Sequence, residues 1–214
     1  MIKNSYPGKF IVLESIDYGG KGTQMTRLEN YFKANHKSKV LMTFEPTDQY
    51  YGRRIREGLK DPEIFQKVPE HGFQTLYAVD SREHMVNRII PALEDGVIVI
   101  SDRYRISSMA YGARTVKEID SIYAINKFVL GDLFIWPDLI VLIDISADLA
   151  LQRKESAGRE FDVFEQKQYL ERVRSNYLHI ANNLAYPNIQ VVNGDGGVEE
   201  VFTKIRDLIL SIKK

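Results

Sequence analysis

Residues 9–24 read KFIVLESIDYGGKGTQ, and this stretch decides the fold. It begins with the apolar run Phe10–Leu13, passes through a turn with two adjacent glycines, and continues after Lys21 as a polar helical pattern. A strand, a glycine-rich turn and a helix N-terminus together present backbone N–H groups to phosphate, and a lysine adds a full positive charge. The stretch therefore predicts a site for a nucleoside triphosphate.

The loop departs from the usual phosphate-loop pattern at two positions. Ser15 stands where the pattern has its first glycine, and Gly22 stands where it has the Ser or Thr that faces Mg²⁺. Thr23 follows directly, but it points to another side of a regular helix. The alternative is an ordinary strand–turn–helix with a tight Gly-Gly turn. The strand before the turn and the helix after it favour the phosphate loop.

The composition gives the chain no strong charge bias. Its 214 residues include 29 Lys plus Arg and 29 Asp plus Glu, so the formal net charge is zero, and there is no cysteine. This balance argues against nucleic acid or an anionic membrane as a partner, and disulfide and thiol chemistry are excluded. There is no signal-peptide pattern and no apolar run long enough to span a bilayer. We expect a single domain over residues 1–214, located in the cytoplasm.

Short apolar runs alternate with helical patterns along the chain. The runs are rich in Ile and Val and barely alternate in polarity, which is typical of parallel strands covered on both faces. Strands that alternate with helices predict an α/β fold in three layers around a central five-stranded parallel sheet. The expected strands are Phe10–Leu13, Val40–Phe44, Val97–Ile100, Leu139–Ile143 and Ile189–Val192, and the expected helices are Gln24–Lys33, Phe73–Leu93, Lys117–Leu130, Ala147–Lys154, Gln166–Leu184 and Val198–Ile212.

Polar residues follow each expected strand. Because ligands of such sheets bind at the C-terminal ends of the strands, these residues should lie along one edge. A single one, such as Asp144, fits a helix cap, whereas the whole set on one edge fits a binding site. The set is Ser15, Asp17, Glu45, Asp102, Arg103, Asp144 and Asn193.

The segment Val99–Tyr104, VISDRY, is the second informative motif. An arginine at a strand end beside a phosphate loop can bind a second phosphate through two hydrogen bonds. Asp102 would then act on Mg²⁺ through water or hold Arg103 in place. A surface Asp–Arg pair that closes the strand is the alternative, which the neighbouring glycine-lysine loop disfavours.

Taken in order, these motifs resemble those of the thymidylate kinases, a family of P-loop nucleoside monophosphate kinases. The resemblance covers nearly the whole chain, and an ordered set is more specific than any one motif. It implies a P-loop NTPase fold with a short lid over about residues 153–165. The matching segments are 14–24 (ESIDYGGKGTQ), 44–46 (FEP), 76–84 (LYAVDSREH), Pro91-Ala92-Leu93 with Gly96, 102–112 (DRYRISSMAYG) and 137–139 (PDL).

The resemblance implies that ATP donates its γ-phosphoryl group to dTMP, with Mg²⁺ accompanying ATP. Mg²⁺ would be held mainly through the ATP phosphates, with Asp17 and Asp102 as candidate carboxylates. It also implies a homodimer packed through the segment Phe73–Leu93. The implied ATP-binding residues are Ser15, Ile16, Asp17, Tyr18, Gly19, Gly20, Lys21, Gly22, Thr23, Arg153, Asn193 and Gly194, and the implied substrate-binding residues are Asp17, Glu45, Tyr77, Ser81, Arg82, Asp102, Arg103, Ser107, Ser108 and Tyr111.

Four residues would carry the chemistry according to the resemblance: Asp17, Lys21, Arg103 and Arg159. Arg159, or else Arg153, would close from the lid over the transferred group, whose charge spreads in the transition state. For Arg159 the alternative is a solvated loop charge, since polar lids normally carry several charges.

Three departures from the family pattern concern the acceptor. Phe44 replaces an arginine, Ser81 stands where the family has an arginine that hydrogen-bonds thymine, and Gly112 replaces a glutamine near the base. A pocket without such a donor loses discrimination that depends on paired polar contacts. Phosphorylation of dTMP is the expected activity. The alternatives are a nucleoside monophosphate kinase with a different or broader base preference, or a nucleotide-binding protein with little turnover.

Overall fold

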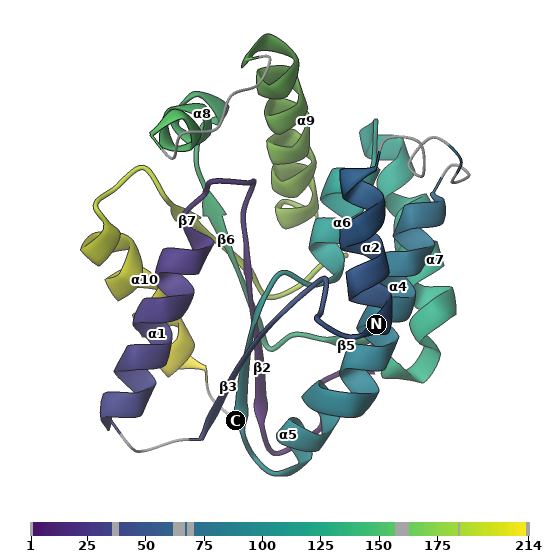
Figure 1. The fold of residues 1–214 in the computed structure, drawn as a ribbon. Coiled ribbons are helices and arrows are strands. Elements are labelled where there is room, and N and C mark those ends of the chain that lie inside the picture. Colours follow the sequence, from purple (N-terminus) through teal and green to yellow (C-terminus); the bar gives the residue numbers. More distant parts are fainter. Residues whose placement is uncertain are drawn as a thin grey trace.

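The computed structural model describes residues 2–35, 39–61, 67, 71–156, 163–183 and 185–212, with the backbone alone for 163–166. A five-stranded parallel sheet forms its centre, in the order β3-β4-β2-β6-β7 (Figure 1). The predicted α/β fold with a five-stranded parallel sheet is therefore confirmed. The strands are β2 (Lys9–Glu14), β3 (Val40–Phe44), β4 (Ile98–Asp102), β6 (Leu139–Asp144) and β7 (Ile189–Asn193).

The central strand β2 explains why both faces of the sheet are covered. Successive residues of a strand point to opposite faces. Phe10 and Val12 accordingly enter one hydrophobic core, and Ile11 and Leu13 enter the other. All four side chains are completely buried. An uninterrupted apolar run thus specifies a strand between two helical layers.

The helices divide between the two faces of the sheet (Figure 1). The helices α1 and α10 cover one face, and α4, α6, α7 and α9 pack over the other. The bounds are α1 (Lys21–Asn35), α2 (Tyr50–Lys60), α4 (Gly72–His84), α5 (Ile90–Glu94), α6 (Arg105–Gly112), α7 (Ile119–Leu130), α8 (Ala147–Glu155), α9 (Val163–Ala181) and α10 (Val198–Ser211).

The structure adds elements that the sequence analysis did not predict. Helices α2 and α6 are new, and so is a small parallel sheet of β1 (Ile2–Lys3) with β5 (Ile135–Trp136). The helix expected over Phe73–Leu93 contains a π-helical turn, η1 (Met85–Ile89), between α4 and α5. Pro91 follows this turn and lacks the N–H of a regular helical hydrogen bond, which accounts for the local widening.

Two short 3₁₀ turns, η2 (Val116–Glu118) and η3 (Gly131–Leu133), flank α7. The lid expected at about residues 153–165 begins in the last turn of α8, and its centre, 157–162, lies outside the described residues. Within the part of the chain that the structure describes, no helix has the length and apolar character needed to cross a membrane.

Candidate active site

The loop between β2 and α1 is built by close backbone packing. Tyr18 has a φ of 62° and Gly20 a φ of 90°, and these left-handed residues turn the chain back toward the start of α1. A Cβ added at Gly19 would lie 1.8 Å from Ser15 Oγ, so only glycine fits there beside Ser15. Ser15 Oγ in turn donates to the carbonyl of Ile143 at 2.7 Å, which anchors the loop to β6. Ser15, which stands in place of the usual first glycine, thus stabilises the conformation of the loop.

Lys21 begins α1 and lies almost completely buried beneath this loop. Its Nζ donates to the carbonyl of Ser15 at 3.4 Å and lies 3.9 Å from Asp102 Oδ1. Burial, followed by the charge of Arg103, lowers the pKa of Lys21 to about 8, although Asp102 and Asp17 act in the opposite direction. A bound phosphate chain would raise this pKa again, because an anion favours the protonated form of the lysine.

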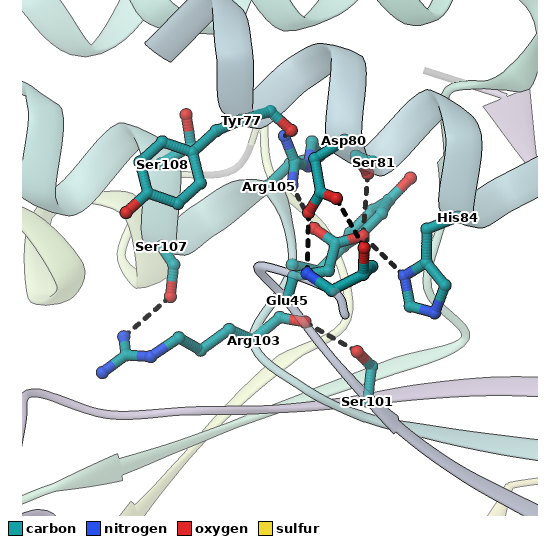
Figure 2. Close-up of polar contacts among 12 residues, drawn as sticks. Glu45, Tyr77, Asp80, Ser81, His84, Ser101, Arg103, Arg105, Ser107 and Ser108 are labelled. Carbon is teal, nitrogen blue, oxygen red and sulfur yellow. Dashed lines mark hydrogen bonds and ion pairs between the residues drawn. The ribbon is translucent and has the colours of Figure 1, made fainter. Parts of the chain in front are cut away.

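Arg103 lies at the end of β4 with a φ of 73°, a conformation that costs free energy outside glycine. Its backbone N–H donates to the carbonyl of Leu13 at 2.9 Å, which fixes it beside β2. The guanidinium lies 4.8 Å over the ring of Tyr111. Its hydrogen bonds, partly visible in Figure 2, go from Nη1 to Ser107 Oγ (2.9 Å), Ser15 O (3.3 Å) and Tyr177 Oη (3.3 Å), and from Nη2 to Asp17 Oδ1 (2.5 Å) and Tyr111 Oη (3.1 Å).

Glu14, the last residue of β2, holds in place Ser107 and Tyr177, two side chains that contact Arg103. It is completely buried and accepts hydrogen bonds from Ser107 Oγ at 2.6 Å, Tyr177 Oη at 2.9 Å and the backbone N–H of Tyr104 at 2.9 Å. Burial raises the pKa of Glu14, while Arg103 and these hydrogen bonds oppose that shift. Sequence reasoning did not assign this residue to the site, although an acidic residue at the end of an apolar strand was the available signal.

A cavity of about 370 Å³ opens beside Arg103. The dimensions suit a small ligand. Seven of the residues predicted to contact substrate line this cavity: Asp17, Glu45, Tyr77, Arg103, Ser107, Ser108 and Tyr111. Its other lining residues were not predicted, namely Pro46, Leu59, Phe73, Gln74, Tyr104, Arg105 and Tyr169.

Glu45 forms the centre of a buried network at the wall of this cavity (Figure 2). Its Oε2 is ion-paired with Arg105, and its Oε1 accepts from Ser81 Oγ at 2.9 Å and lies 3.0 Å from His84 Nδ1. Burial alone would raise the pKa of Glu45, but Arg105 and His84 outweigh it and hold the pKa below its usual value. Both carboxylate oxygens are therefore occupied by protein groups.

The structure does not bring Ser81 or Arg82 to the cavity, although both were predicted to contact substrate. Ser81 is completely buried behind Glu45. Arg82 points to α7, where it donates to the carbonyl of Leu130 at 2.8 Å, because neighbouring helical residues point about 100° apart. Arg105 lies at the cavity instead, and its position directly after Asp102-Arg103-Tyr104 was the signal for it. Asp102 lies beside Lys21 rather than in this cavity.

A smaller cavity of about 160 Å³ lies on the other side of the phosphate loop. Arg153 lines it and donates to the carbonyl of Gly194 at 3.1 Å. Asn193, also predicted here, is exposed and accepts from the backbone N–H of Asp195 at 2.9 Å. The remaining predicted lid residue, Arg159, lies outside the described residues. The lining residues are Gly19, Gly20, Thr23, Gln24, Arg153, Gly194, Gly196, Val198 and Val201.

The carboxylate oxygens near the phosphate loop suit a metal ion that binds together with a phosphate ligand. The described residues contain no cluster of three or more His, Cys, Asp or Glu placed to hold a metal. Asp102 Oδ1 is buried without a hydrogen bond to any described residue, and Asp17 is half exposed nearby at the loop. Carboxylate and phosphate oxygens suit Mg²⁺, which keeps several of its waters. Asp144, by contrast, is occupied by a two-bond pair with Arg174, and Ser146 is the N-cap of α8.

Comparison with known proteins agrees with this geometry. The family model of thymidylate kinase matches residues 13–205. A probable thymidylate kinase of Pyrococcus abyssi is 36% identical over 206 residues, which cover 94% of this chain and 96% of the relative. A thymidylate kinase of Desulfotalea psychrophila is 34% identical over 209 residues, which cover 97% of this chain and 96% of the relative.

Proposed function

The chain belongs to the thymidylate kinase family, and from this premise we propose how its site acts. The chain transfers the γ-phosphoryl group of ATP to dTMP and releases ADP and dTDP. The observation that supports the assignment of roles most directly is the group formed by Lys21, Asp17 and Arg103. It connects the phosphate loop to the cavity of about 370 Å³.

The phosphate loop holds the ATP phosphates in this proposal. The backbone N–H groups of the loop and the N-terminus of α1 supply partial positive charge, and Lys21 supplies a full charge. The smaller cavity beside Gly19 and Gly20 then takes the nucleoside part of ATP, with Arg153 at its wall. Its place beside the loop supports this assignment.

The larger cavity holds dTMP, with its phosphate at Arg103. The guanidinium is oriented by Asp17, Ser107 and Tyr111 before substrate arrives, so little reorganisation is needed. A planar guanidinium matches a phosphate through two parallel hydrogen bonds. Tyr77, on the same wall of the cavity, supplies an aromatic face for the base.

The transfer needs no covalent intermediate on the protein. An oxygen of the dTMP phosphate attacks the γ-phosphorus, the bond to the oxygen between the β- and γ-phosphates breaks, and its electron pair leaves on ADP. A phosphate monoester has its second pKa at about 6, so no base has to remove a proton at neutral pH. Mg²⁺, when bound with ATP near Asp17 and Asp102, would neutralise phosphate charge. Positioning by Lys21 and Arg103 supplies the rest.

Two features of the family remain proposals for this chain. A lid arginine, Arg159, would stabilise the charge of the transferred group, and Arg159→Ala should then lower kcat on the order of 10³-fold. A homodimer would pack through α4, η1 and α5. Val86 is exposed on η1, which supports that surface, and Val86→Asp should shift the species seen by analytical ultracentrifugation from dimer to monomer.

The activity is tested by ADP formation from ATP and Mg²⁺ against a panel of dTMP, dUMP, dCMP, UMP, CMP, AMP, dGMP and GMP. We expect the highest kcat/KM with dTMP. Turnover with another acceptor in preference would contradict the assigned substrate, and ATP binding without turnover of any acceptor would contradict the kinase activity itself.

A further inference from the structure

Gln74 places a side-chain amide in the wall of the larger cavity. It lies in the first turn of α4 and is half-buried, so a ligand in the cavity can reach it. Its Oε1 accepts a hydrogen bond from Ser108 Oγ at 2.8 Å. Its Nε2 makes no hydrogen bond to any other residue that the structure describes. One oxygen lone pair and both amide N–H groups are thus available to a ligand.

Gly112 makes the space for this amide. A Cβ added at Gly112 would lie 2.5 Å from Cδ and from Nε2 of Gln74, and 2.9 Å from its Cγ. Heavy atoms do not approach this closely, so any larger residue at position 112 would push Gln74 out of place. The φ of Gly112 is not left-handed, so its backbone would accept alanine. The glycine is needed for the neighbouring side chain rather than for its own conformation.

The position of Gln74 relative to Arg103 indicates which part of a nucleotide it meets. Ser107 and Ser108 are consecutive residues of α6, and Ser107 contacts Arg103 whereas Ser108 contacts Gln74. Arg103 adjoins the phosphate loop through Asp17, so the phosphate end of the acceptor belongs there. The base then fills the remaining part of the cavity, beside Tyr77 and Gln74.

We propose that Gln74 reads the edge of the acceptor base and selects a pyrimidine with a 4-oxo group. The inference rests on the proposed function, in which a deoxynucleoside monophosphate occupies this cavity. Thymine and uracil present an N3–H donor beside the O4 acceptor. The amide matches them in the orientation seen here, with Oε1 accepting from N3–H and Nε2 donating to O4.

Cytosine presents the reverse pattern, with an acceptor at N3 and an amino donor at C4. The amide of Gln74 would have to turn over to match it, and Ser108 Oγ would then accept from Nε2 instead of donating to Oε1. Glu45, which also lines the cavity, offers no substitute, because both its oxygens already accept from Ser81, His84 and Arg105. Arg105 carries only donors and repels an amino group. Arg105 therefore disfavours a 4-amino pyrimidine, and Glu45 has no free oxygen to accept from its amino group.

The test compares kcat/KM for dTMP, dUMP and dCMP in the wild type and in Gln74→Met, which keeps the length of the side chain and removes its amide. We expect kcat/KM for dTMP and for dUMP to fall about tenfold each, because each loses the same paired contacts. The dTMP-to-dUMP ratio should stay constant, the dTMP-to-dCMP ratio should fall, and the KM for ATP should not change.

Two further variants separate recognition from folding. Gly112→Ala leaves Gln74 intact but displaces it, so it should lower the dTMP-to-dCMP ratio in the same direction. Thr75→Ala changes the exposed neighbour of Gln74 on α4 and should leave all three values as in the wild type. An unchanged dTMP-to-dCMP ratio in Gln74→Met would overturn the proposal, and so would an equal loss for all three acceptors.

The failure of this inference is distinguishable from the failure of the proposed function. If the wild type does not phosphorylate dTMP, the kinase assignment fails. The reading of the base is then still measured by calorimetric titration of dTMP and dCMP into the wild type and Gln74→Met. A weaker affinity for dTMP alone in the variant supports the proposal, and equal changes for both nucleotides overturn it.

Discussion

Arg103 Nη2 donates a hydrogen bond to Asp17 Oδ1 at 2.5 Å, and this contact joins the end of β4 to the phosphate loop. Asp17 is half exposed, with 49% of its side chain accessible, whereas Arg103 is only 18% exposed. The arginine is therefore held in place by the protein while the aspartate faces solvent. An incoming phosphate meets a cation that is already oriented, which lowers the cost of reorganisation during transfer.

Arg103→Ala should weaken the binding of dTMP more than the binding of ATP. The variant removes the guanidinium that we assign to the acceptor phosphate, so the KM for dTMP should rise at least tenfold while the KM for ATP changes little. Steady-state kinetics with each substrate varied in turn give both values. A rise confined to the KM for ATP would contradict the assigned role of Arg103.

Lys21→Ala should remove most of the turnover, by about a hundredfold or more, because the phosphate loop loses its full positive charge. The matched control is Lys33→Ala at the far end of α1, where the lysine is exposed and paired with Glu29. The control should retain wild-type rates. Normal rates in Lys21→Ala would contradict the assignment of the loop.

The lowered pKa of Lys21 predicts how ATP use depends on pH. In the free enzyme this pKa is about 8, since burial disfavours the charged form. Below that pH the lysine is protonated and attracts phosphate, and above it the charge is lost. The kcat/KM for ATP should therefore fall as pH rises through about 8. Lys21→Arg, which stays charged, should abolish this fall, and a wild-type profile that stays flat one unit above that pKa would contradict the prediction.

Gly22→Ser should lower the Mg²⁺ concentration needed for half-maximal activity. Apart from its chain neighbours and the backbone of its own helix, no atom of the described residues lies within 4 Å of a Cβ added at Gly22, so the side chain fits without displacing its surroundings. The hydroxyl would restore the group that the usual phosphate loop offers to Mg²⁺. Titration of Mg²⁺ at fixed ATP measures the effect. Gly22→Ala adds the same Cβ without the hydroxyl and should leave the Mg²⁺ requirement unchanged, and an equal effect of both variants would contradict the prediction.

Ser81→Arg should destabilise the fold. Ser81 is completely buried, and its neighbour Glu45 at the wall of the cavity is already paired with Arg105. A second guanidinium there would have no carboxylate of its own, and an unpaired buried charge costs about 3–5 kcal/mol. Urea unfolding measures the loss. Arg105→Val in the same chain frees Glu45 for the new arginine and should recover much of the stability. A single variant as stable as the wild type would show that the site admits both arginines.

The parts that the sequence predicted are local in origin. The β2–α1 loop depends on a few adjacent residues whose backbone conformations are limited, with Gly19 and Gly20 in the turn and Lys21 at the start of the helix. The five central strands were recognised because short apolar runs without alternation are typical of parallel strands that are buried on both faces. Helices α2 and α6 were missed, and α6 has only eight residues, too few to show a clear helical period.

The residues that the sequence did not reveal are those whose role depends on a neighbour far along the chain. In the sequence Gln74 is only a polar residue of a helix, and its role depends on Ser108 of α6, which lies 2.8 Å from it. The role of Arg105 depends in the same way on its ion pair with Glu45, sixty positions earlier. The same folding takes Ser81 and Arg82 away from the cavity.

By itself the sequence determined the phosphate loop, the parallel sheet and the family. The loop conformation depends on adjacent residues, the strands are marked by local apolar runs, and the family is marked by the order of short motifs. Only the tertiary structure decided which side chains surround the acceptor. The walls of that cavity come from β2, β3, β4, α2, α4, α6 and α9 or from the segments that follow them, and packing alone sets the distances between their side chains.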